Sequence, residues 1–429
     1  MAITNRHLMI LVLMCNYFLF GLLLNSVGIV ILQSINSFGV SKESAALLEG
    51  FKDLPIAIVS FFVASLLPRL GYRKAMLIAV ALVLLACLAM PVIASFWATK
   101  LFFLCVGSAF ALIKVSVYAS VGLLTNSKQN HASLLNSIEG IFMCGVLSGY
   151  WIFSAFIDDQ NPASSAWLNV YWLIAGLCAF NLLLMFAVKF DDRPATDSTT
   201  ELTTEPTSKL TTNTNPASPI TSPFEDFIAM LKLVLRPLVY SFMGAMFLYV
   251  LIEQGIGTWL PTFNSEVLRL PASIAVQITS LFALSLALGR LGAGWLLRFI
   301  PWHLFLAGCI LAMATLVILT LPLAHNVEAK ADSHWFNLPL AAYIFPLIGL
   351  FMAPIYPLLN SLVLSSLPQR QQSSMTGLII IFSALGGTTG SIITGTVFNQ
   401  FSGQTAFYLA LIPMACIFLL IFHLKRMST

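Results

Sequence analysis

The segment KFDDRPATDSTTELTTEPTSKLTTNTNPASPITSPF (Lys189–Phe224) divides the chain into two parts of similar length. It is dense in Thr, Ser and Pro and shows no hydrophobic periodicity. Such a segment cannot bury enough apolar surface to fold alone. We therefore predict a flexible cytoplasmic linker over 189–224, with one domain over residues 1–188 and a second over 225–429.

Both flanking parts are strongly apolar. The 429 residues are 59% hydrophobic and 9% charged, with a mean hydropathy of +0.91, which a soluble globular fold of this length would not tolerate. A spanning helix needs about 20 mostly apolar residues, and six such runs stand on each side of the linker. Their continuity excludes the alternating pattern of a β-barrel. The runs cover 8–33, 46–67, 74–96, 99–125, 132–157, 166–188, 237–260, 272–297, 302–323, 339–366, 374–398 and 404–424.

The six-plus-six pattern predicts an all-α polytopic membrane protein with twelve transmembrane helices in two pseudo-symmetric six-helix bundles. A substrate site is expected between the bundles near the midplane. A weak internal echo supports the repeat, because LNSVG (Leu24–Gly28) lies late in the first run and IEQGIG (Ile252–Gly257) lies at a similar depth in the seventh.

Basic residues predict the orientation of the chain. If both termini are cytoplasmic, that side receives most Lys and Arg, including the cluster at Arg69, Arg73 and Lys74. The chain is expected in a bacterial-type cytoplasmic (inner) membrane. The formal charge of +4 then follows mostly from topology, so no nucleic acid partner is expected. The cysteines all lie in apolar runs, which predicts packing roles and no metal site.

Four stretches carry a resemblance to a known family. PRLGYRKAM (Pro68–Met76) has the basic spacing of the cytoplasmic loop signature of the major facilitator superfamily, although Pro68 stands where that signature has an acid. GRLGAGWLLRFIP (Gly289–Pro301), FMAPIYPLLNSLVLSSL (Phe351–Leu367) and YVLIEQGIGTW (Tyr249–Trp259) resemble helices of the fucose/glucose/galactose–proton symporter family within it. The resemblance implies a secondary transporter driven by a proton or another ion gradient, with no bound cofactor.

The resemblance also contains a mismatch. In that family, carboxylates on the first and fourth helices serve sugar recognition and proton coupling, and the matching positions here are Ser26 and Lys114. The fifth helix has Glu139 where the family has glutamine. Proton coupling would therefore have to use Glu139, Asp53, Glu49 or Glu253.

Charges inside the spanning runs are the main candidate site residues. Each costs roughly 2.5 to 3.5 kcal/mol at the membrane centre. The presence of Glu49, Lys52 and Asp53 in LLEGFKDLPIAIV (Leu47–Val59) therefore indicates a functional or structural role for these charges. Counted from an outer edge near Leu48, Asp53 lies at most two turns deep. We expect the three to line the outward mouth of the substrate path, held ionised by pairing; a salt-bridged external vestibule is the structural alternative.

Lys114 and Glu139 lie at similar depth in runs joined by a short loop, which predicts an ion pair. Glu253 has no basic residue nearby in its own helix, so it is the candidate for a carboxyl that keeps its proton while buried; solvation at the helix end is the alternative. Arg290 is expected to be structural. Asn25, Asn136, Tyr356 and Asn360 are expected, with Gln33, to line the site for a hydroxylated substrate.

The Gly-rich stretch SALGGTTGSIITG (Ser383–Gly395) lacks the ending of a nucleotide-binding loop and lies inside a spanning run, which predicts close helix packing. No catalytic pattern is present, so no enzyme is predicted.

The leading function is proton-coupled symport of a small polar, monosaccharide-like solute by alternating access. Alternatives are a transporter of an amino acid or organic acid, an exporter, and a non-transporting membrane sensor. The expected partners are the small-molecule substrate and the lipid bilayer, with the protein as a monomer.

Overall fold

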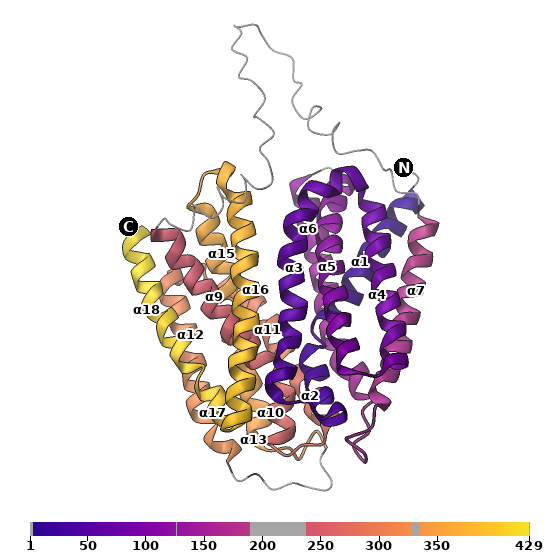
Figure 1. Ribbon diagram of the computed structural model, residues 1–429. Coiled ribbons are helices and arrows are strands. Elements are labelled where there is room, and N and C mark those ends of the chain that lie inside the picture. The colour runs from indigo at the N-terminus through magenta and orange to yellow at the C-terminus, as the bar shows by residue number, and fades with distance from the viewer. Residues whose placement is uncertain (1–2, 126, 189–236, 326, 328–333, 429) are drawn as a thin grey trace, which may run out of the picture.

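The computed structural model describes residues 3–125, 127–188, 237–325, 327 and 334–428. These residues form helices and no strands. Figure 1 shows two helical bundles side by side, with the N-terminal and C-terminal ends at the same end of the molecule. The predicted all-α, two-bundle fold is confirmed. The linker at 189–224, and the predicted start of the second domain at 225, lie outside the described residues.

Among the described residues, the first bundle contains seven α-helices, and the second contains ten. In the first, the helices are α1 (Ile3–Leu24), α2 (Val27–Phe38), α3 (Lys42–Leu70), α4 (Tyr72–Ile93), α5 (Phe96–Leu124), α6 (Lys128–Ser154) and α7 (Val170–Ala187). In the second, they are α9 (Pro237–Gly257), α10 (Leu260–Glu266), α11 (Ala272–Leu296), α12 (Trp302–Thr320), α13 (Leu340–Ile344), α14 (Ile348–Met352), α15 (Ile355–Ser365), α16 (Gln369–Gln400), α17 (Gly403–Tyr408) and α18 (Leu411–Ser428).

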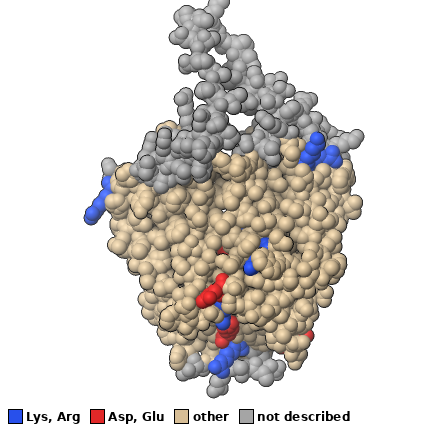
Figure 2. All heavy atoms as spheres, in the orientation of Figure 1, with Lys and Arg blue, Asp and Glu red and all other residues tan. Residues whose placement is uncertain are grey.

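Within the described residues, 11 helical stretches are long and apolar enough to cross a membrane. The remaining predicted run lies in α3, which has 29 residues and carries Glu49, Lys52 and Asp53. Charged side chains gather at the upper end and in the lower half of the face in Figure 2, while most of that surface is uncharged. The largely uncharged remainder of this surface suits a lipid environment.

Several runs predicted as single helices are interrupted, including 339–366, which divides into α13, α14 and α15, and 404–424, which divides into α17 and α18. The breaks in the first and seventh runs are alike. The first breaks at Asn25 and Ser26, whose side chains donate to the carbonyl oxygens of Gly21 (3.1 Å) and Leu23 (2.7 Å), because short polar groups compete with the helical backbone. The seventh breaks at Thr258, shortly before Pro261, which has no N–H to continue the ladder. The breaks occupy corresponding places in the two bundles, as the sequence echo suggested.

The glycines of α16 allow neighbouring helices to approach closely. A Cβ at Gly386 or Gly390 would collide with a backbone carbonyl of α9. A Cβ at Gly387 would lie 2.7 Å from Asp53 Oδ2 in the other bundle. The interpretation of Ser383–Gly395 as a packing segment is therefore confirmed.

The bundles are joined at the end away from the termini, hereafter the far end. Lys42 forms a salt bridge with Glu266 at 3.0 Å, and the rings of Trp151 and Trp335 stack with centroids 5.3 Å apart. Ser273 N donates to Asp159 Oδ1 at 2.9 Å. At the terminus-bearing end, no hydrogen bond or ion pair crosses between the bundles among the side chains that the structure describes, which exclude those of 64–69 and 369–374. The described structure is thus closed at the far end.

Candidate functional site

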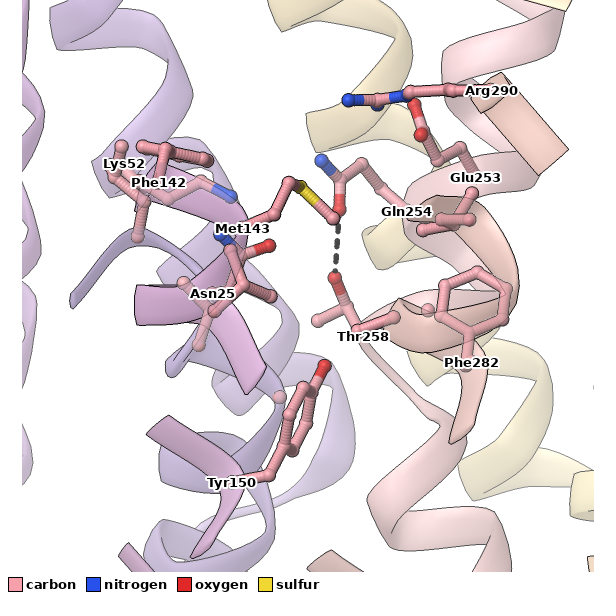
Figure 3. A pocket seen from close by; sticks show the side chains of 17 residues that line it. Asn25, Lys52, Phe142, Met143, Tyr150, Glu253, Gln254, Thr258, Phe282 and Arg290 are labelled. Carbon is pink, nitrogen blue, oxygen red and sulfur yellow. Dashed lines mark hydrogen bonds between the residues drawn. The ribbon is translucent and has the colours of Figure 1, made fainter. Parts of the chain in front are cut away.

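A cavity of about 160 Å³ lies between the two bundles and takes its lining from both. Figure 3 shows side chains of the first bundle facing those of the second across it. The polar or charged lining residues are Asn25, Lys52, Tyr150, Glu253, Gln254, Thr258 and Arg290. Phe142, Met143 and Phe282 supply much of the apolar wall.

Helix geometry explains which residues reach the cavity. Glu253, Gln254, Gly257 and Thr258 share one face of α9 because residues three and four apart are neighbours on a helix. Phe142, Met143, Val146 and Tyr150 form the matching face of α6. Asn25 reaches the cavity because α1 ends just before it.

The buried cluster consists of Glu49, Lys52 and Asp53 on α3. Lys52 forms salt bridges with Glu49 and, at 3.4 Å, with Asp53. Glu49 is 0% and Lys52 6% exposed. The closed far end covers the cluster in this structure, so its expected place at an outward mouth stays a prediction.

The helix that carries the cluster begins before the apolar run does. Helix α3 begins at Lys42, six residues before the assumed edge, with Ser41 Oγ accepting from Ser44 N at 3.2 Å. Asp53 thus lies eleven residues into the helix, or roughly 16 Å at 1.5 Å per residue. The apolar pattern alone misses this polar first turn.

The buried cluster makes direct contact with the second bundle. Thr258 Oγ1 lies 3.0 Å from Glu49 Oε2 and 3.1 Å from Gln254 Oε1. A hydroxyl has one proton to donate, so the second contact needs a proton from the Glu49 carboxyl or from the Gln254 amide turned over. The cluster therefore joins α3 to α9 at the level of the cavity.

Glu253 lies at the edge of the cavity away from Tyr150. Arg290 of α11 is its strongest basic electrostatic neighbour, and Lys52 and Glu49 act on it from α3. Among the described residues, no basic nitrogen lies within 4.0 Å of the Glu253 carboxylate, so Glu253 forms no salt bridge with them. Glu253 is thus a partly accessible carboxyl in the same electrostatic environment as the buried cluster.

The carboxyls around the cavity outnumber the basic groups. Three carboxyls (Glu49, Asp53 and Glu253) interact with two basic groups (Lys52 and Arg290). An unpaired charge is far more costly in a low-dielectric interior than a neutral or paired group. One added proton would therefore make the set formally neutral.

A second charged site, the open pair, consists of Lys114 and Glu139. Tyr118 Oη donates to Glu139 Oε1 at 2.8 Å, and Lys114 Nζ lies 5.9 Å from the centre of the Phe110 ring. No carboxylate among the described residues lies within 4.0 Å of Lys114, whose side chain is solvent-accessible. The predicted Lys114–Glu139 ion pair is thus not a direct salt bridge here: the Tyr118 hydroxyl binds the carboxylate, and Glu139 acts on Lys114 electrostatically.

The structure brings together only part of the predicted site. Asn25 and Glu253 line the cavity, and Glu49 and Asp53 join it through Lys52. Lys114, Asn136, Glu139, Tyr356 and Asn360 do not line it, although Tyr356 packs against Tyr249, one turn before Glu253, with ring centroids 5.9 Å apart.

Four polar lining residues were not predicted as site residues: Tyr150, Gln254, Thr258 and Arg290. Gln254 and Thr258 flank Glu253 with the spacing of one helix face, which was a usable signal. Arg290, expected to be structural, lines the cavity. Tyr150 carried no signal, since it depends on how α6 faces α9.

Comparison with known proteins identifies the family. The model described as Major Facilitator Superfamily matches residues 10–390, so the chain belongs to that superfamily. No curated protein sequence matches the chain.

Solved structures share the fold at low identity. A mutant of the nucleoside transporter NupG is 14% identical, with a TM-score of 0.73, covering 98% of this chain and 99% of that one. FucP in the outward conformation is 16% identical, with a TM-score of 0.58 and coverage of 98% and 99%. A bacterial homologue of the human lysosomal transporter Spinster, inward-facing and unoccupied, is 13% identical, with a TM-score of 0.71 and coverage of 99% and 96%.

Proposed function

We propose that this protein is a secondary active transporter that couples the movement of a small hydroxylated solute to a proton by alternating access. The observation that carries this proposal is the charge imbalance around the cavity. Three carboxyls face two basic groups in a set that includes side chains from both bundles. Because a proton neutralises the set, proton binding and the contact between the bundles are linked.

Glu253 is our candidate for the group that takes the proton. Glu49 and Asp53 are each held in a salt bridge by Lys52, whereas Glu253 has none with a described residue. It also lines the cavity, so a proton can reach it from there. The gradient supplies the energy, and no cofactor is proposed.

The cavity suits a small uncharged polar solute. Its volume of about 160 Å³ is more than ten times the roughly 10 to 15 Å³ that a single water needs, which leaves room for a small solute. Asn25, Gln254 and Tyr150 offer donors and acceptors, and the rings of Phe142 and Phe282 offer flat apolar surfaces. A hydroxylated ring has both kinds of surface, and fucose and nucleosides, for which two similar transporters are named, contain one.

An amino acid or organic acid is the second candidate substrate. The observation that favours it is the accessible Lys114, which has no described carboxylate within 4.0 Å. A solute carboxylate could bind beside Lys114, and an exporter would use the same geometry.

We also propose an inner-membrane monomer with both termini cytoplasmic, so that the far end is the outer one.

The test begins with thermal unfolding of purified protein against sugars, nucleosides, amino acids and organic acids, because a ligand of the folded state raises the melting temperature. Uptake of the stabilising solute into proteoliposomes follows, with and without an imposed pH gradient. Stimulation by an inward proton gradient is expected, with Glu253→Gln insensitive to it. Flux that ignores the gradient in the unmodified protein would refute the coupling, and absence of flux with any stabilising solute would favour a sensor.

A further inference from the structure

Helix α9 has two different faces. One lines the central cavity through Glu253, Gln254 and Thr258. The other, which includes Leu251, Ile252 and Gly255, borders a second cavity of about 300 Å³ within the second bundle. Helices α16, α17 and α18 supply the remaining walls of this second cavity, hereafter the lateral groove.

The lateral groove opens sideways between α16 and α18. Helix α9 packs along both of these helices, whereas α16 and α18 make few contacts with each other. Ile412 and Cys416, on the edge formed by α18, are exposed. Both lie in a stretch long and apolar enough to cross the membrane. The opening therefore faces the hydrocarbon of the bilayer, in the half nearer the far end.

The lining of the groove determines what can occupy it. Thr394 carries the one hydroxyl among the lining side chains, and the others are hydrocarbon apart from the Cys416 thiol. A buried water needs two to four polar partners, so water is a poor occupant. An empty groove would lose dispersion contacts along its whole lining. The remaining occupant is the hydrocarbon that surrounds the helices.

We propose that the lateral groove binds one acyl chain of a bilayer phospholipid from the leaflet at the far end. The groove of about 300 Å³ has room for a segment of an acyl chain. The chain packs on the back of the α9 segment whose front faces the central cavity. Gly255 adds no side chain to this wall of the groove, and a Cβ there would lie 2.8 Å from Thr394 Oγ1. The site stands independently of the substrate proposed above.

The test uses the full-length protein in nanodiscs that contain a phospholipid with a diazirine in the middle of one acyl chain. After photolysis, adducts are located by mass spectrometry. Cys416→Trp places a large side chain at the mouth of the groove, and Ala415→Trp, on the adjacent exposed residue, is the matched control. Ile412→Trp on the same edge serves as a second plug if Cys416→Trp does not fold.

We expect adducts concentrated on residues 248–256 and 409–416, about tenfold fewer with a plugging variant, and no change with Ala415→Trp. Adducts that are equal in all variants, or spread evenly over the lipid-facing helices, would overturn the site. Displacement of the probe by excess free fatty acid, but not by excess unlabelled phospholipid, would overturn the phospholipid as its source.

Discussion

The two charged sites of the first bundle differ in burial and in partners. The buried cluster pairs its base with two acids on the same helix and contacts Thr258 across the bundle interface. The open pair is accessible, lies within one bundle and has its acid bound by Tyr118. Similar residue types therefore serve different purposes. We infer that the buried cluster stabilises the closed far end, while the open pair is available to a solute.

The largest effect should come from removing the base of the buried cluster. Lys52→Met leaves two carboxyls uncompensated and should destabilise the protein by about 3 to 5 kcal/mol, whereas Lys114→Met should change thermal unfolding little. The triple variant Glu49→Gln, Lys52→Met, Asp53→Asn should recover most of the loss. Equal melting temperatures for Lys52→Met and Lys114→Met would remove the distinction between the two sites.

The contact across the interface should have the next largest effect. Thr258→Val removes the hydroxyl bound to Glu49, and the unpaired group should cost the closed far end about 1 to 3 kcal/mol. The readout is crosslinking of Lys42→Cys to Glu266→Cys by a short bis-maleimide in a background without other cysteines, because the ends of the Lys42 and Glu266 side chains lie 3.0 Å apart when the far end is closed.

A loss of about 1 kcal/mol corresponds to roughly a fivefold drop in the ratio of closed to open protein. Thr315→Val is the matched control, because Thr315 Oγ1 donates to Leu311 O within its own helix at 2.8 Å, away from the interface. If Thr258→Val and Thr315→Val give the same yield of the crosslinked product, Thr258 does not stabilise the closed far end.

The charge of the open pair should determine a preference among solutes. Lys114→Gln should weaken binding of an anionic or zwitterionic solute at least about tenfold, or about 1.4 kcal/mol, and leave a neutral sugar almost unchanged. Thermal-shift titration with both classes measures this difference. Equal loss for the neutral and anionic solutes would mean that Lys114 acts through the fold.

The smallest effect is expected from the hydroxyl that binds Glu139. Tyr118→Phe removes a hydrogen bond of 2.8 Å and should change solute affinity by about 0.5 to 1.5 kcal/mol. Tyr240→Phe, on the exposed face of α9, is the matched control. A solute affinity in Tyr118→Phe equal to that in Tyr240→Phe would place Glu139 outside the solute path.

The sequence predicts the spanning runs and the two-bundle fold well, because hydrophobic length is a local property. The breaks at Asn25 and Thr258 follow from local chemistry that the hydropathy pattern does not register. The site is predicted less completely. Glu253 and Asn25 could be found from their helices alone, whereas Tyr150 and Arg290 depend on how the bundles face each other, which no single run encodes.

The central claim is that Glu253 carries a proton with the solute while the open pair does not. The most direct measurement is solute-driven alkalinisation outside proteoliposomes, recorded with a pH dye, for the unmodified protein, Glu253→Gln and Glu139→Gln. We expect alkalinisation in the unmodified protein and in Glu139→Gln, and solute exchange without proton movement in Glu253→Gln. Full proton movement in Glu253→Gln, or its loss in Glu139→Gln alone, would contradict this account.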